Sequence, residues 1–214
     1  PHMGADLGNG EVVDQDLRCY FHKWRYSGEG QLQSVPCMES PPAVKTRAWP
    51  VQEAYGTIWV YAAEVAPYPV PEVPGLEGQK VLVWRLSPVT LYAHHHVMMV
   101  GGIDLQHFGA VHNLHVDFKV EREQSNPQVA DWRLRGPIGS KGWRGRLAAW
   151  LFGGEIGYHA RFSGGSVVAL SYGAGLKFWG KGPAVPALSI VWGCVARADG
   201  IGEVRIFLVA PRGR

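Results

Sequence analysis

The chain has only three cysteines among its 214 residues, too few for a disulfide framework. It has no apolar run long enough to cross a membrane, and its net charge of +3 gives no argument for a nucleic-acid partner. Its low cysteine content suits a reducing compartment, so we expect a cytoplasmic protein, with membrane association left open. The chain is instead rich in glycine (28) and proline (15), which favours short strands and turns.

A proline-rich segment divides the sequence into two predicted parts. Residues 1–65 have the pattern of short strands broken by turns, and residues 66–78, with four prolines at 67–74, predict an extended linker. The second predicted part is residues 79–214. Its expected elements are strands over 81–86, 90–99 and 115–122, a short helix over 101–112, and a hairpin of 187–196 and 202–210 around a turn at 197–200.

Cys19 and His22 form a Cys-x-x-His pair, and 16 residues separate Cys19 from His2. Paired Cys-x-His and Cys-x-x-His motifs at this separation hold a Rieske [2Fe–2S] cluster, in which two imidazoles bind one iron and two thiolates the other. The missing cysteine is expected just before Pro1. Two alternatives are a buried thiol beside an ordinary histidine, and a cloning scar at Pro1-His2-Met3. The matched spacing favours the cluster.

A second group of possible ligands follows the pattern D-x-x-H-x4-H, formed by Asp104, His107 and His112. On a helix Asp104 and His107 share one face, whereas His112 lies roughly one and a half turns further on, where the helix has to distort or end. Two imidazoles and one carboxylate make a facial triad that leaves iron positions open for O2 and substrate. The alternative is two ordinary polar histidines near a helix terminus.

Together these motifs resemble those of the α-subunits of Rieske non-heme iron ring-hydroxylating oxygenases. The likeness rests on the stretch from Cys19 to Gly30, on the Gly-Thr-Ile-Trp-Val-Tyr sequence at 56–61, and on residues 104–112. Cys37 lies where this family often has a cysteine that does not bind iron. The chain has Val100-Gly101-Gly102 where the family commonly has Glu-Asn or a lone Asn before the aspartate, a difference that bears on the polarity around the iron ligands and on substrate choice.

The resemblance implies a strand-rich α+β fold. A small all-β Rieske domain would precede part of a helix-grip-like catalytic domain with an antiparallel sheet. His2, Cys19 and His22 would bind the [2Fe–2S] cluster, His107 and His112 would bind a mononuclear Fe(II), and Asp104 would bridge the two centres for electron transfer across a homo-oligomer, usually a trimer. The third iron ligand is expected beyond Arg214, which makes the chain a fragment, truncated at both ends and inactive on its own.

The implied function is that of a terminal oxygenase. A reductase or ferredoxin would supply electrons that come from NAD(P)H, and O2 would oxidise a hydrophobic ring-containing substrate, which residues 104–112 suggest is a bulky ring system. The alternatives are a Rieske electron carrier and a non-catalytic binding domain with a degenerate iron site. A carrier leaves about 150 residues unexplained, and truncation explains the missing third ligand more simply than degeneration does.

Three further features carry weaker predictions. His94 and His96 would share one face of a strand with no third ligand nearby, which favours histidines lining the iron pocket over a separate metal site. Asp199 is expected to be a turn residue. A basic stretch is interleaved with tryptophans, a pattern that can bind nucleic acid or a membrane surface. A solvated loop or a docking face for an acidic electron donor fits it at least as well; its cations are Arg133, Arg135, Lys141, Arg144 and Arg146.

Overall fold

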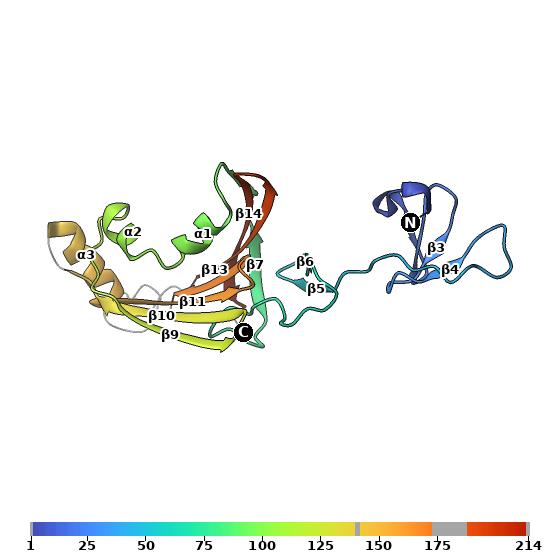
Figure 1. Cartoon of the computed structure of the whole chain (residues 1–214). Coiled ribbons are helices and arrows are strands. Elements are labelled where there is room, and N and C mark those ends of the chain that lie inside the picture. Colours follow the sequence, from blue (N-terminus) through green and yellow to red (C-terminus); the bar gives the residue numbers. More distant parts are fainter. Residues whose placement is uncertain (1, 140–141, 173–187, 213–214) are drawn as a thin grey trace. The chain divides into compact units, whose positions relative to one another are not determined.

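A computed structural model describes residues 2–139, 142–172 and 188–212 (Figure 1). The chain forms two compact units, one of Pro1–Gln52 and Ile58–Pro67, the other of Glu53–Thr57 and Tyr68–Arg214. All strand pairs with a described register are antiparallel, which agrees with the predicted strand-rich α+β class. None of the helices in the described part of the chain has the length and apolar character that crossing a membrane requires.

The first unit is built from short strands, as its turn-rich sequence predicts. After the 3-10 turns η1 (His2–Gly4) and η2 (Leu7–Asn9) come four strands that pair in chain order: β1 (Glu11–Val13), β2 (Asp16–Arg18), β3 (Arg25–Tyr26) and β4 (Leu32–Ser34). Tyr26, Leu32 and Val35 form its core, with Trp24 packed against them. Gly30 closes the β3–β4 turn at φ 84°, and a Cβ there would lie 2.3 Å from the carbonyl oxygen of Thr46. Only glycine fits this approach.

A two-stranded hairpin, β5 (Val51–Ala54) and β6 (Thr57–Val60), follows. The tip of this hairpin, Glu53–Thr57, clusters with the second unit. In that unit the Tyr55 hydroxyl donates to the carbonyl oxygen of Pro71 at 2.8 Å, and the Tyr55 ring lies 6.3 Å from that of Phe207. Burial raises the pKa of Tyr55 to about 12, so this phenol stays a hydrogen-bond donor at neutral pH.

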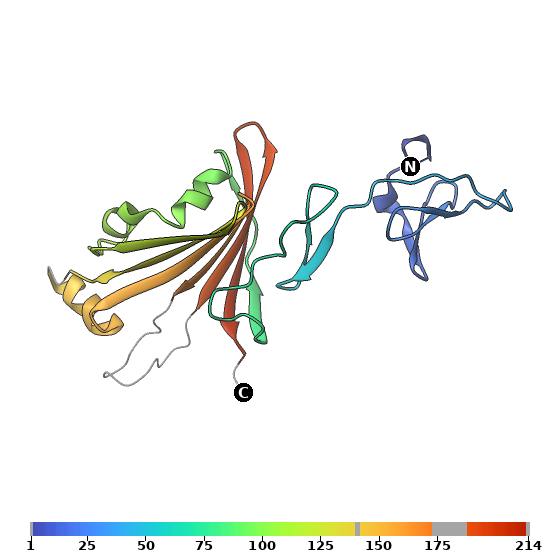
Figure 2. The same cartoon turned by 60° about the horizontal axis from the view of Figure 1, so that its bottom comes forward.

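The second unit is an eight-stranded antiparallel sheet in the order β7-β14-β13-β12-β11-β10-β9, with β8 also paired to β14. The strands are β7 (Val81–Arg85), β8 (Val89–Leu91), β9 (Lys119–Asn126), β10 (Val129–Pro137), β11 (Glu155–Ser163), β12 (Val167–Tyr172), β13 (Ser189–Ala198) and β14 (Ile201–Pro211). Figure 2 shows the strands running side by side along this sheet. The β13–β14 hairpin turns at 199–200, close to the predicted turn.

Two short helices, α1 (His96–Gly101) and α2 (Leu105–Ala110), lie over one face of this sheet (Figures 1 and 2). The layer between these helices and the sheet is apolar. Every second residue of a strand points to this face, and those residues are apolar. The buried members of this layer are Met99, Leu134, Tyr158, Ala160, Val168, Leu170, Trp192, Cys194 and Val204, with Met98, Ile103 and Phe108 of the helical segment packed against them. We call this side of the sheet the inner face.

The helical segment differs from the sequence prediction in two respects. The single helix expected over 101–112 is wrong, because Gly102–Asp104 separates two helices. The strand expected over 90–99 is also wrong beyond Leu91, because the chain turns at His94 and helix α1 begins at His96. Met98 and Met99 instead pack on the sheet from a helix.

Strand β9 begins at Lys119, four residues later than predicted, and β10, β11, β12 and helix α3 (Gly142–Phe152) had no counterpart in the predicted elements. The predicted basic stretch spans β10 and α3. Arg133 pairs with Glu123 and Arg135 with Glu155, so these two cations are matched by acids on the neighbouring strands. Lys141 and the side chain of Arg144 lie outside the described residues.

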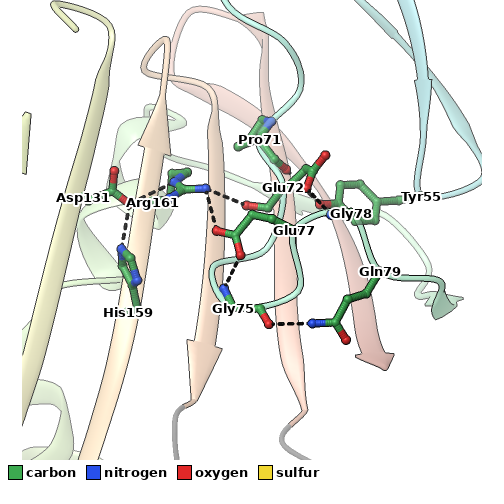
Figure 3. Close-up of polar contacts among 10 residues, drawn as sticks. All are labelled: Tyr55, Pro71, Glu72, Gly75, Glu77, Gly78, Gln79, Asp131, His159 and Arg161. Carbon is green, nitrogen blue, oxygen red and sulfur yellow. Dashed lines mark hydrogen bonds and ion pairs between the residues drawn. The ribbon is translucent and has the colours of Figure 1, made fainter. Parts of the chain in front are cut away.

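The opposite face of the sheet carries a polar network around Asp131 (Figure 3). The Asp131 carboxylate accepts from His159 Nε2 at 2.6 Å and from Arg161 Nε at 2.9 Å, and its side chain is only 8% exposed. Arg161 also reaches Glu77 at 3.3 Å and the carbonyl oxygen of Glu72 at 3.4 Å. The network therefore ties residues 72–77 to strands β10 and β11.

These residues fall in the predicted linker 66–78. From Tyr68 onward the segment clusters with the second unit, and Pro71, Val73 and Pro74 are buried. Glu72 and Glu77 accept from the backbone N–H groups of Gly78 and Gly75 at 2.8 and 2.7 Å. This part of the proline-rich segment is therefore fixed by hydrogen bonds and burial in the second unit.

Replacing Asp131 by alanine should destabilise the second unit by roughly 2–3 kcal/mol, because Arg161 and His159 lose a shared, buried partner. The matched control is Glu123→Ala, which breaks the exposed pair with Arg133 on the neighbouring strand and should cost less than about 1 kcal/mol. Urea unfolding at pH 7 measures both. Equal losses in the two variants would mean that Asp131 does not hold the network together.

The stability of the protein should fall as the pH drops below about 6.5, partly through His159. Burial lowers the pKa of His159, against the opposing effect of its hydrogen bond to Asp131. His159 therefore binds a proton more readily in the unfolded chain than in the native one. Its contribution to the free energy of unfolding is fully present above the unfolded pKa and is lost as the pH falls towards the lower native pKa. In His159→Gln the unfolding free energy should fall less than in the wild type between pH 7.5 and 5.5, whereas parallel curves would exclude His159.

Candidate functional site

The first candidate centre lies in the loop after β2. Cys19 is 4% exposed and directly follows Arg18. Its N–H donates to the carbonyl oxygen of Trp24 at 2.8 Å, while the N–H of Lys23 donates to the Cys19 carbonyl at 3.1 Å. Lys23 adopts a left-handed conformation, φ 60°, which lets the loop close within five residues. This closure places the Cys19 thiol and the exposed His22 on one small loop.

His2 lies against the same loop. Its Nδ1 atom lies 3.3 Å from Nδ1 of His22, and its ring stacks on Trp24 with centroids 4.1 Å apart and planes at 15°. Two nitrogens on one tetrahedral metal with bonds of about 2.1 Å, as in zinc sites, would be roughly 3.4 Å apart. The two imidazoles therefore fit the histidine side of a Rieske cluster.

The second candidate centre is formed at helix α2. Asp104 is its N-cap, and Oδ1 accepts from the backbone N–H groups of Gln106 at 3.0 Å and His107 at 3.3 Å. The helix ends at Ala110, and Asn113 adopts a left-handed conformation, φ 51°. The helix therefore ends before His112, in agreement with the expectation that it has to distort or end there.

Ending the helix brings His107 and His112 together. Their Nε2 atoms lie 3.1 Å apart and their ring planes meet at 74°. Two cis ligands of an octahedral metal with bonds of about 2.1 Å would be roughly 3.0 Å apart, so this pair suits a six-coordinate iron with open positions as well as it suits a ring-to-ring hydrogen bond. Asp104 contacts His107 through the backbone N–H, and the described contacts do not include one to the imidazole.

An aromatic layer lies beneath this histidine pair. The Phe108 ring is stacked with Tyr158 at 5.7 Å and makes an edge contact with Phe118 at 5.0 Å, and it lies 6.3 Å from the His112 ring. Burial raises the pKa of Tyr158, and Tyr172 and Asp104 add to the shift, so the phenol stays neutral. The pair therefore borders an apolar environment on the inner face of the sheet.

Gly102 explains how the helices approach this layer so closely. A Cβ at this position would lie 3.4 Å from both Phe162 and Trp192 and 3.3 Å from the carbonyl oxygen of Met99. A larger residue would push the α1–α2 segment away from the sheet. Gly102 therefore has a packing role, whereas a Cβ at Gly101 would have no heavy atom within 4 Å.

The described contacts of these two centres do not include the other predicted residues, so the expectation that His94 and His96 line the iron pocket stays a prediction. Asp199 is an exposed turn residue between β13 and β14, as predicted, and Cys37 is an exposed free thiol. His94 and His95, in the turn before α1, and His96, its first residue, lie close together and do not form the predicted strand. The sequence prediction missed Asp131 and His159. In β11, Ile156, Tyr158, Ala160 and Phe162 alternate with His159 and Arg161 in the way a half-buried strand requires.

Comparison with known proteins agrees with the geometry of the first centre. Residues 1–55 match the Rieske [2Fe-2S] domain family. Over 122 residues the chain is 36% identical to the probable 3-ketosteroid-9-alpha-monooxygenase oxygenase component of Rhodococcus rhodochrous, a match covering 52% of this chain and 30% of that protein. It is 31% identical over 125 residues to the 3-chlorobenzoate-3,4-dioxygenase oxygenase subunit of Comamonas testosteroni, covering 55% and 28%.

Among solved structures, dicamba monooxygenase bound to dicamba superposes with a TM-score of 0.59 at 15% identity, covering 95% of this chain and 62% of that one. This likeness shows the fold. The sequence matches span about 30% of the length of the curated relatives. The chain thus carries a Rieske [2Fe–2S] domain, and the comparisons support the class that its motifs indicate, the oxygenase component of a Rieske-type system.

Proposed function

We propose that the protein is the terminal oxygenase of a Rieske non-heme iron system acting on a hydrophobic, ring-containing substrate. The observation that carries this proposal is the presence of two separate histidine pairs, each with nitrogens at a metal-sharing distance: 3.3 Å for His2 and His22, and 3.1 Å for His107 and His112. A Rieske electron carrier requires only the first pair.

Cys19, His2 and His22 would hold the [2Fe–2S] cluster, and His107 and His112 would hold a mononuclear Fe(II). When bound, the cluster supplies electrons and the mononuclear iron activates O2. The residues of the chain fix the ligand geometry. Stacking on Trp24 orients the His2 ring, and the end of α2 turns His112 back towards His107.

The aromatic layer of Phe108, Phe118 and Tyr158 supports an apolar substrate, because flat rings beside the histidine pair favour aromatic or polycyclic groups over charged ones. The name of the Rhodococcus relative indicates a ketosteroid, whereas that of the Comamonas relative indicates a chlorinated benzoate. We propose the bulkier ring system, in agreement with the resemblance of residues 104–112.

Asp104 is proposed to be the bridge between the two centres. Two observations support a second role for this carboxylate. Asp104 is exposed, and both capping bonds use Oδ1, which leaves Oδ2 outside those bonds. A reductase or ferredoxin fed by NAD(P)H is the proposed electron donor. A homo-oligomer, with a trimer as the expected form, is the proposed assembly.

The proposed function is tested on the protein expressed from its complete reading frame, loaded with iron. Substrate-dependent O2 uptake is measured with a 3-ketosteroid and with a benzoate, and EPR of the reduced protein reports the cluster. Uptake with the ketosteroid should disappear in His107→Ala/His112→Ala while the cluster signal stays. The control His115→Ala, an exposed neighbour, should keep both. A cluster signal without uptake for any substrate in the wild type would identify an electron carrier.

Two substitutions separate the charge of Asp104 from its helix-capping role. Asparagine caps helices as well as aspartate does, so Asp104→Asn should keep α2 and its iron but lower turnover at least tenfold, about 1.4 kcal/mol of barrier. Asp104→Ala should in addition lose about 1 kcal/mol of stability. Asp117→Asn, at a nearby exposed aspartate, is the matched control. Wild-type turnover in Asp104→Asn would exclude a bridging carboxylate.

A further inference from the structure

Three consecutive histidines lie close together where the turn after β8 runs into α1: His94, His95 and His96, the first residue of the helix. One nitrogen of each imidazole lies within 4.8 Å of the other two. The ring centroids form a nearly equilateral triangle with sides of 4.3, 4.4 and 4.6 Å. No carboxylate or thiol belongs to this group among the described residues.

This arrangement depends on the local backbone. In a strand, the side chain of His95 would point away from those of His94 and His96. Here the chain turns instead: the N–H of Val97 donates to the carbonyl oxygen of His94 at 3.0 Å, and the N–H of His96 donates to Nδ1 of His94 at 3.3 Å. The second bond occupies Nδ1 of His94, so Nε2 is the nitrogen that this ring can offer to a ligand.

The surroundings also point to a ligand. Nδ1 of His95 is buried and has no hydrogen-bond partner among the described residues. An unpaired buried nitrogen is unfavourable unless something binds it. Glycines keep space around the group: a Cβ at Gly165, φ 69°, would lie 3.4 Å from Nε2 of His96, and a Cβ at Gly202 would lie 3.2 Å from the Cα of His95.

We propose that His94, His95 and His96 form a tripod that binds one Zn²⁺ ion, with the fourth position open to water. Three neutral imidazoles suit zinc and other late first-row divalent metals. Ligand nitrogens on a tetrahedral metal are roughly 3.4 Å apart. The widest separation of 4.8 Å closes to this value by side-chain rotation of His94 and His96, which are both exposed.

This tripod is separate from the histidine pair at α2. The pair lies beside Phe108, which stacks on Tyr158 of β11, whereas His96 lies beside Gly165, beyond the end of the same strand. Five residues from Tyr158 to Ser163 extend about 17 Å along a strand. The group of nitrogens within 4.8 Å of one another does not include His107 or His112, so one ion is not shared by the two groups in this structure. A metal in the tripod would fix the start of α1, the helix that leads to Asp104.

The test is a zinc titration of the purified protein by calorimetry, with bound metal counted after dialysis. His94→Ala/His96→Ala is compared with His107→Ala/His112→Ala and with the control His115→Ala. Both residues changed in the first variant are exposed, so its fold should survive, which circular dichroism checks. His94→Ala/His96→Ala should bind one zinc ion per chain fewer than the wild type, because the affinity of the tripod for zinc should fall by about 100-fold or more. The control His115→Ala should bind as much zinc as the wild type.

His107→Ala/His112→Ala should keep the zinc ion that the tripod binds. Failure of the proposed iron site and failure of the tripod therefore give different results. Cobalt(II) provides an independent readout: its tetrahedral absorption bands should appear in the wild type and in His107→Ala/His112→Ala but not in His94→Ala/His96→Ala. Equal zinc stoichiometry and affinity in the wild type and in His94→Ala/His96→Ala would overturn the proposal.

Discussion

Two side chains five residues apart diverge by about 140° on a regular helix, so His107 and His112 can meet only if the helix ends between them. The structure meets this constraint by stopping α2 at Ala110 and placing Asn113 in the left-handed region. Asp104 caps the other end of the same six-residue helix. The position of each possible ligand thus depends on where α2 begins and ends.

The same principle applies at the other two histidine groups. The left-handed Lys23 closes the loop that carries Cys19 and His22, and a turn before α1 gathers His94 to His96. Regular elements separate neighbouring side chains or repeat them at fixed angles, whereas turns allow several imidazoles to converge. The large sheet supplies the rigid support beneath α1 and α2, and Gly102 allows the close contact with Trp192.

Much of this arrangement could be predicted from the sequence. Ligand types and spacings pointed to His2, Cys19 and His22, and the helical period required the helix to distort or end near His112. The turn at Asp199 and the strands beside it followed from alternation and turn residues. The comparisons support the predicted class, whereas the ligand roles of individual residues stay predictions.

Other features could not be predicted, because they depend on packing between distant segments. Met99 lies in a helix because it packs against strands that follow much later in the chain. His95 joins His94 and His96 only because that helix starts where it does. The pairing of Asp131 with His159 and Arg161 depends on the register of β10 against β11, which sets residues about 30 positions apart side by side.

The central claim is that the two histidine pairs hold two different iron centres. Mössbauer spectroscopy of the protein from its complete reading frame, enriched in ⁵⁷Fe, tests this claim most directly. We predict cluster iron and mononuclear iron in a ratio of about two to one, with the smaller component absent from His107→Ala/His112→Ala. Cluster iron alone in the wild type, or a smaller component that survives this double substitution, would contradict the account.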